Sequence, residues 1–184
     1  GAEIARIEGL SDAVFAFAVT LLVVSLEVPH TFHDLVNVMR GFPAFAICFA
    51  MLAQVWYQHS KFFRRYGLQD TYTVALNCVL LFVVLFYVYP LKFLFTSLLG
   101  QMSRGALLPD NASVMSEVGD TRALMVIYGL GFAAVFGVFA FLYLYAYKKR
   151  TALDLDELEI HRTRHSLIDN CGMAAFGLLS AGGA

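Results

Sequence analysis

Long apolar segments are the feature that most constrains the fold of this chain. A helix that rises about 1.5 Å per residue needs about 20 consecutive apolar residues to cross the hydrocarbon core of a bilayer. We predict such spans at about residues 5–28, 35–60, 71–95, 121–147 and 160–184. The composition agrees, because 59% of the 184 residues are hydrophobic and only 15% are charged, whereas soluble domains average about 45–50% and about 25%. The sequence therefore predicts an all-α fold, a polytopic transmembrane helical bundle that forms one domain over residues 1–184.

Polar and helix-breaking residues mark the predicted boundaries. The second span has Pro43 in its first turns, and the third has Pro90 near its end. We expect a basic loop at 61–70 and the longest loop at 96–121, which is rich in glycine, proline, asparagine and serine. An amphipathic stretch at 152–165 leads into the fifth span, which is the least apolar of the five.

The distribution of lysine and arginine predicts the orientation of the bundle. Nine basic residues lie at the N-terminus and in the loops on its side, and four lie at the other side. By the positive-inside rule the N-terminus is cytoplasmic. Five spans then place the end of the given sequence outside, and this odd number, with a first residue other than methionine, leads us to expect that part of the protein is missing from it.

The first span has one face that differs from the rest. At about 100° per residue, one stripe holds the only hydroxyl in mid-span and the only acid at the outer end. Its members are Leu10, Ala13, Phe17, Thr20, Val24 and Glu27. The opposite face is uniformly large and apolar. Thr20 could simply bond a carbonyl one turn earlier, and Glu27 could be a solvated helix end. Alternatively, the stripe lines a pathway around an oligomer axis, with Glu27 forming a ring of carboxylates at its mouth.

Charged and polar residues lie at the inner end of this span, and their presence inside a membrane segment has to be explained separately. A charge well inside a span costs about 3 kcal/mol or more, so such groups normally pair or face protein. Possible partners lie at the same membrane level in the second and third spans. The sequence therefore predicts a polar cluster that joins the first three spans, although interfacial anchoring would also explain the tryptophan and histidine. The cluster would contain Arg6, Ser11, Asp12, Trp56, His59 and Asn77.

These residues resemble the signature of a known family. An R-x-x-x-F-S-D-like motif opens the first span, W-x-x-H follows in the second, and an asparagine precedes a proline by thirteen residues in the third. The pattern is similar to that of prokaryotic single-repeat members of the lysosomal/endosomal potassium channel family (transmembrane protein 175 type). The resemblance covers roughly residues 5–95, whereas the fourth and fifth spans agree only in placement and hydropathy.

The resemblance implies a homotetrameric, potassium-permeable channel with six helices per subunit and the first helix lining the pore. Its partners would be further copies of itself and the lipid bilayer, and potassium would be the permeant species, with no cofactor. The motif residues would hold the helices together. Phe17 would form the constriction, Thr20 would take part in selectivity, and Val24 with Leu21 beside it would form the next layer.

Three departures from the family pattern affect these expectations. Leu10 replaces the phenylalanine of the motif, and Phe17 replaces an aliphatic constriction residue. The sixth helix is absent from the given sequence, which affects the expected assembly. Since the chain has no T-V-G-Y-G-like carbonyl filter, discrimination has to come from pore width and ion dehydration, which predicts weak to moderate selectivity for potassium.

Other functions find less support in the same residues. Histidine pairs at His30 and His33 and at His161 and His165 could bind a metal, but solvated histidines explain them better. The sequence contains no nucleophile elbow or phosphate-binding loop, which argues against an enzyme, and its net charge of −1 gives no basic field for nucleic acid. A non-conducting structural or regulatory membrane subunit and a proton-leak pathway through the same pore remain as alternatives.

Overall fold

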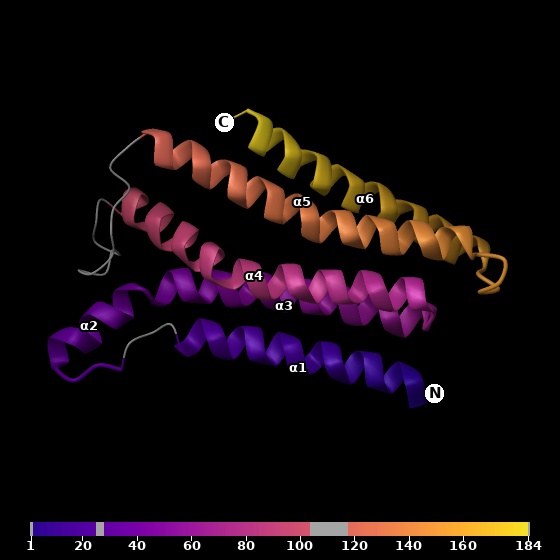
Figure 1. Ribbon diagram of the computed structural model, residues 1–184, viewed down its shortest axis with the longest axis horizontal. Helices are drawn as coiled ribbons and strands as arrows, with labels where there is room; N and C mark the ends of the chain where they lie inside the picture. Colours follow the sequence, from indigo (N-terminus) through magenta and orange to yellow (C-terminus); the bar gives the residue numbers. More distant parts are fainter. Residues whose placement is uncertain (1, 25–27, 104–117, 184) are drawn as a thin grey trace.

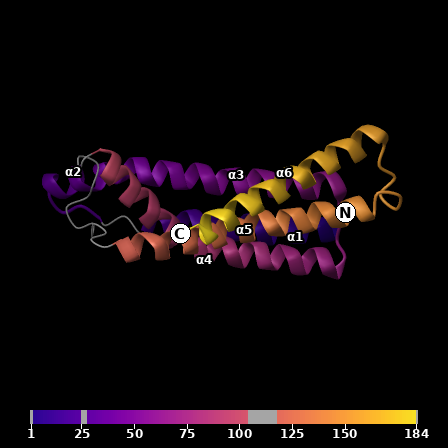
Figure 2. The same cartoon turned by 90° about the horizontal axis from the view of Figure 1, so that it is seen from above.

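The computed structural model describes residues 2–24, 28–103 and 118–183, with side chains from 6 in the first of these ranges and from 122 in the last. These residues form six helices and no strands. The helices are α1 (Ala2–Val24), α2 (Phe32–Arg40), α3 (Phe42–Tyr66), α4 (Thr71–Met102), α5 (Val118–Lys148) and α6 (Glu157–Gly182). Figures 1 and 2 show the five long helices running side by side along the molecule, with the short α2 at one end. The predicted all-α bundle is confirmed.

The segment predicted as one span at 35–60 is built from two helices. Thr31 caps α2, and its side chain and that of Asp34 form a reciprocal capping box. The helix then stops at Gly41, and α3 restarts with a bend of 45° between the two axes. Pro43 explains the break, because its ring would clash with the carbonyl of residue 39 in a continuous helix, whereas the first turn of a new helix accepts it.

Two loop predictions were wrong at their edges. α3 continues to Tyr66, so the basic loop shrinks to residues 67–70, where Gly67 ends the helix at a φ of 57°. α4 passes through Pro90 and takes in the start of the predicted long loop. The amphipathic stretch at 152–165 and the fifth span share the single helix α6 from Glu157 onward. Charged residues at a span's end are compatible with helix, because they reach the aqueous phase beyond the hydrocarbon core.

Among the described helices, α1, α4 and α5 are long and apolar enough to cross a membrane, and the bent α2–α3 pair can count as a fourth span. α6, where the fifth span was predicted at 160–184, is not in this group, because its first half is charged and polar residues such as Asp169 and Asn170 interrupt its second half.

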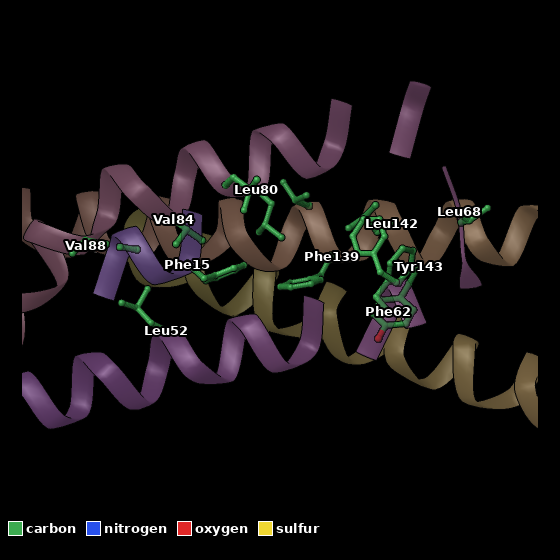
Figure 3. Close-up of a cluster of buried hydrophobic side chains, with 14 of the residues drawn as sticks. Phe15, Leu52, Phe62, Leu68, Leu80, Val84, Val88, Phe139, Leu142 and Tyr143 are labelled. Carbon is green, nitrogen blue, oxygen red and sulfur yellow. The ribbon is translucent and has the colours of Figure 1, made fainter. Parts of the chain in front are cut away.

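Aromatic and aliphatic side chains from α1, α3, α4 and α5 fill a common core (Figure 3). Phe62 of α3 meets Tyr143 of α5 edge to face, with ring centroids 5.2 Å apart. Phe15 and Leu22 bring α1 into the same core. This packing fixes which face of α1 is turned inward.

Two glycines let α5 approach its neighbours closely. A Cβ atom on Gly129 would lie 2.6 Å from the backbone oxygen of Gly177 in α6. Gly131 lies under the ring of Tyr87, whose hydroxyl donates to the carbonyl of Ile127 over 3.0 Å. The α4–α5 contact therefore depends on the missing side chain at Gly131.

Replacing Gly131 with alanine is expected to destabilise the protein. The new methyl carbon would overlap the ring of Tyr87, so the ring has to move and its hydrogen bond to Ile127 is lost. Overpacking of this kind costs about 1–3 kcal/mol. The matched control is Gly137→Ala in the same helix, where a Cβ meets nothing within 4 Å. Thermal unfolding in detergent tests this, and equal melting temperatures for the two variants would contradict it.

Candidate ion pathway

The two faces of α1 have opposite surroundings. Phe15, Ala18 and Leu22 are buried against the other helices. The stripe identified in the sequence faces away from them, since Phe17 is 54% and Val24 70% exposed. Leu10 and Thr20 are exposed as well, as is Ala13, and Leu21 is half-buried at the edge of the stripe. Glu27, the predicted mouth residue, lies outside the described residues.

The hydroxyl of Thr20, on this stripe, is hydrogen-bonded within its own helix. Its hydroxyl donates to the carbonyl of Ala16 over 2.9 Å, which is the back-bond expected for a threonine in mid-helix. Because this bond uses the only hydroxyl proton, Oγ1 has only lone pairs left, which can accept a further hydrogen bond.

A buried chain of hydrogen bonds links α1, α4 and α3. Ser11 Oγ donates to the carbonyl of Ile7 (2.9 Å) and accepts from Asn77 Nδ2 (3.0 Å). Asn77 Oδ1 lies 2.7 Å from His59 Nε2. An amide oxygen can only accept, so Nε2 of His59 carries the proton in this bond. Ser11, His59 and Asn77 are each at most 1% exposed, and each bond therefore satisfies a group that water cannot reach.

A second tie joins α1 to α3 at the edge of this chain. Trp56 Nε1 donates to Asp12 Oδ1 over 2.8 Å, and both side chains remain partly exposed. The ring of His59 packs on Phe63, with centroids 4.5 Å apart. Arg6 is exposed and, within the described residues, takes no part in these hydrogen bonds. The structure thus brings together all the predicted cluster residues except Arg6.

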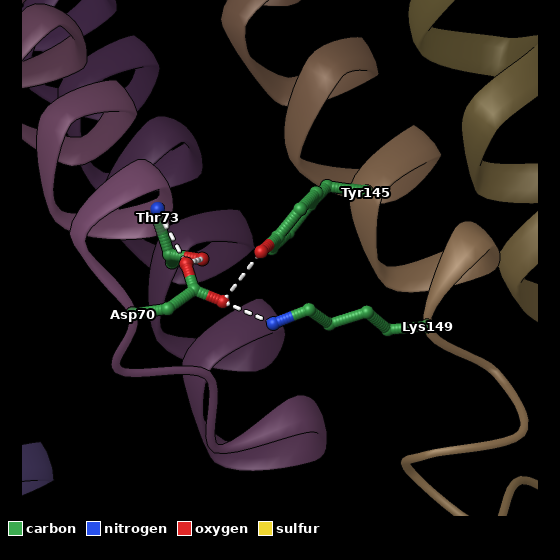
Figure 4. Close-up of polar contacts among 4 residues, drawn as sticks. All are labelled: Asp70, Thr73, Tyr145 and Lys149. Atoms are coloured by element: carbon green, nitrogen blue, oxygen red, sulfur yellow. Dashed lines mark hydrogen bonds and ion pairs between the residues drawn. The ribbon is translucent and has the colours of Figure 1, made fainter.

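A polar cluster that the sequence did not predict lies at the end of the bundle where α3 turns into α4 (Figure 4). Asp70 Oδ1 caps α4 by accepting from the amide and the hydroxyl of Thr73, at 2.9 and 2.8 Å. Asp70 Oδ2 accepts from Tyr145 (2.7 Å) and Lys149 (2.6 Å), which lie at the end of α5. An aspartate before an apolar run is a recognisable cap signal, but nothing in the sequence pairs it with α5. The cluster shows that the α3–α4 and α5–α6 links lie on the same side of the bundle.

These contacts control the ionisation of Asp70. Its partial burial raises the pKa, but the hydrogen bonds from Lys149, Thr73 and Tyr145 outweigh burial and hold the pKa of this carboxyl well below its usual range. The bond to Asp70 raises the pKa of Lys149 in turn. Both groups are therefore charged at neutral pH.

The Asp70 carboxylate is expected to stabilise the fold in a pH-dependent manner. Since its pKa is depressed in the folded state, the contribution is complete above the unfolded pKa of about 3.9 and disappears as the pH falls toward the folded value. Asp70→Asn keeps a capping side chain but loses the charge, and should lower the melting temperature by about 2–4 °C at pH 7. This deficit should shrink below about pH 4. Asp154→Asn, an exposed residue of the α5–α6 link, is the control, and a deficit that is constant with pH would exclude this mechanism.

One of the histidines in the predicted pairs contacts a carboxylate. His165 Nδ1 lies 2.7 Å from Asp169 Oδ2, one turn along α6. Within the described parts of the chain, no three His, Cys, Asp or Glu side chains gather as metal ligands do.

Comparison with known proteins places this arrangement in a family. The family model described as "Endosomal/lysosomal potassium channel TMEM175" matches residues 6–87, which run from α1 into α4. A potassium channel from Marivirga tractuosa is 47% identical over 184 residues, covering 98% of this chain and 74% of that protein. A potassium channel from Chamaesiphon minutus is 31% identical over 112 residues, which are 56% of this chain and 55% of that protein.

Two solved structures have the same fold. The crystal structure of a threonine-to-alanine variant of the potassium channel MtTMEM175, in complex with a nanobody–MBP fusion protein, matches with a TM-score of 0.88 at 46% identity. This match covers 96% of the present chain and 77% of that one. The structure of a lysosomal potassium-selective channel TMEM175 homologue from Chamaesiphon minutus matches with a TM-score of 0.62 at 25% identity, covering 99% and 92%.

The relatives and structural neighbours are potassium channels rather than enzymes. The extent of the similarity and the apolar spans agree on a membrane-embedded helical protein. The chain belongs to the endosomal/lysosomal potassium channel family TMEM175.

Proposed function

We propose that this protein is a potassium-permeable cation channel of a prokaryotic cell membrane, formed by four copies with their N-termini in the cytoplasm. The observation that carries the proposal is the orientation of α1. Its stripe from Leu10 to Val24 is exposed on the subunit, while its opposite face is packed into the core.

An exposed apolar stripe with a hydroxyl in its centre suits the wall of a narrow pore. Four α1 helices around an axis would turn these stripes toward one another and enclose a lumen. Phe17 has the largest side chain on the stripe, so its ring would set the narrowest point, with Leu21 and Val24 forming the next layer. Such an apolar constriction gates by dewetting rather than by charge.

Thr20 would supply the polar element beside that constriction. Its proton is held by the carbonyl of Ala16, so a ring of four Oγ1 atoms would offer only lone pairs to a passing cation. Potassium sheds water more readily than sodium, and a ring of this kind would lower its barrier selectively. We place Glu27 at the pore mouth, where a ring of carboxylates would raise the local cation concentration.

The hydrogen bonds around Asn77 would hold α1 in a fixed orientation against α3 and α4. The bonds that Ser11 accepts from Asn77 of α4 and Asp12 accepts from Trp56 of α3 would fix the rotation of α1 about its own axis. That rotation decides which side chains face the lumen. The polar inner end of α1 would thus hold the helix in the orientation that turns its apolar stripe toward the lumen.

The selectivity of the pore is expected to depend on the hydroxyl at position 20. Thr20→Val keeps the side-chain shape and removes the oxygen, which should bring the ratio of potassium to sodium permeability close to one. Thr20→Ser keeps the hydroxyl and is the matched control. Reversal potentials measured with potassium and sodium on opposite sides of a bilayer give the ratio directly, and an unchanged ratio in Thr20→Val would reject this role.

A further inference from the structure

The long helix α4 bends part of the way along its length, as Figure 1 shows. It runs from Thr71 to Met102 and has Pro90 in its interior. A proline has no amide proton, so the carbonyl of Phe86, four residues earlier, loses its helical partner, and the proline ring crowds that carbonyl. Sharp bends in helices are almost always found at such breaks in the hydrogen-bond ladder. Pro90 is therefore the position at which α4 bends most easily.

The side chains of α4 are buried to different extents before and after this proline. Six residues from Thr73 to Val88 are buried, and some of them are drawn in the core of Figure 3. In residues 91–102, all of which the structure describes, only Gly100 is buried. Local movement is easiest where few groups are buried. The packing thus holds residues 91–102 less firmly than the part of α4 that precedes Pro90.

Two tyrosine hydroxyls connect α4 to α5 at this proline. Tyr87 of α4 donates to the carbonyl of Ile127 in α5 over 3.0 Å. In the opposite direction, Tyr128 of α5 donates to the carbonyl of Pro90 itself. Hydrogen bonds between membrane helices are weak enough on average to break and form again. The Tyr128 bond is made at the bend, so it bears directly on the position of the segment that follows.

We propose that Pro90 is a hinge and that the hydroxyl of Tyr128 holds residues 91–102 against α5. The segment then has two positions, one bonded through Tyr128 and one turned away from α5. Asn77, whose bond to Ser11 joins α4 to α1, precedes the hinge. The movement therefore leaves that contact in place. This inference concerns the fold and does not rest on the proposed channel activity.

Distances between two spin labels, measured on the purified protein in nanodiscs, test the hinge. One label is on Cys171, an exposed native cysteine of α6, and the other on Met102→Cys at the exposed end of α4, with Cys78→Ser to remove the other exposed thiol. Co-expression with an excess of chains that carry Cys78→Ser and Cys171→Ser restricts the signal to distances within one subunit. Residues 91–102 span about 18 Å, so a change of about 20° in the bend moves the end of α4 by about 6 Å.

Tyr128→Phe removes only the hydroxyl and should add a second population, displaced from the first by up to about 6 Å. Tyr89→Phe, which removes the hydroxyl of an exposed tyrosine next to the proline, is the matched control and should leave one population. Adding Pro90→Ala to Tyr128→Phe restores the amide proton at position 90 and should abolish the second population. An unchanged single population in Tyr128→Phe, the same change in Tyr89→Phe, or a second population that persists with Pro90→Ala would each overturn the proposal.

Discussion

Phe17→Ala is expected to increase potassium flux by about tenfold or more. An alanine at the narrowest ring leaves room for a hydrated lumen, and lowering the dewetting barrier by about 1.4 kcal/mol already gives a factor of ten. The side chain is 54% exposed on the subunit, so its removal should not disturb the core. The rate of potassium uptake into liposomes, normalised to the amount of oligomeric protein, measures the effect.

The control is Phe82→Ala, because Phe82 is equally aromatic and 69% exposed but lies on α4. It should leave the flux unchanged. If Phe17→Ala and Phe82→Ala have the same effect, Phe17 is not a constriction and α1 does not line the pathway.

Asn77→Leu should destabilise the protein by about 2 kcal/mol. The substitution removes the acceptor of the His59 Nε2 proton and the donor to Ser11 in a region that is at most 1% exposed. A buried donor without a partner costs about 1–3 kcal/mol, more than the net value of about 0.6 kcal/mol typical of a hydrogen bond between membrane helices. Because the bond to Ser11 sets the rotation of α1, ion flux should fall as well.

A double-mutant cycle separates this explanation from a packing effect. His59→Leu also leaves a buried polar atom unpaired, whereas the double variant His59→Leu/Asn77→Leu removes both partners and should cost less than the sum of the two. Trp56→Phe, which loses only the partly exposed bond to Asp12, should have a smaller effect. Additive losses in the double variant would show that the His59–Asn77 bond is not the cause.

The sequence was sufficient for the features that depend on periodicity and on the cost of burying polar groups. The stripe on α1 followed from helical spacing, and the structure leaves that stripe exposed. Ser11 was singled out because a polar group is expensive in a span, and His59 and Asn77 because they lie at the same membrane level. The three are found in one hydrogen-bonded chain. Local patterns and desolvation costs are properties of the sequence alone.

Features that depend on tertiary geometry could not be predicted from the sequence. Arg6 was expected in the polar cluster, but it is on the exposed side of α1, since an arginine at a helix end can reach water instead. The Asp70–Lys149 pair joins residues 79 positions apart, and only the packing of α5 against α4 brings them together.

The most direct test of a potassium pathway along α1 is the reversal potential of currents through the purified protein in a planar bilayer. Parent and Phe17→Ala proteins would be compared under a tenfold potassium gradient, with sodium on the opposite side and equal pH, and then under a pH gradient alone. We expect currents that reverse between zero and the potassium equilibrium potential, as weak to moderate selectivity for potassium requires, and that do not follow the pH gradient. Currents that follow protons would assign a proton leak, and silence of both folded, tetrameric proteins would favour a non-conducting membrane subunit. Either result would contradict a potassium pathway along α1.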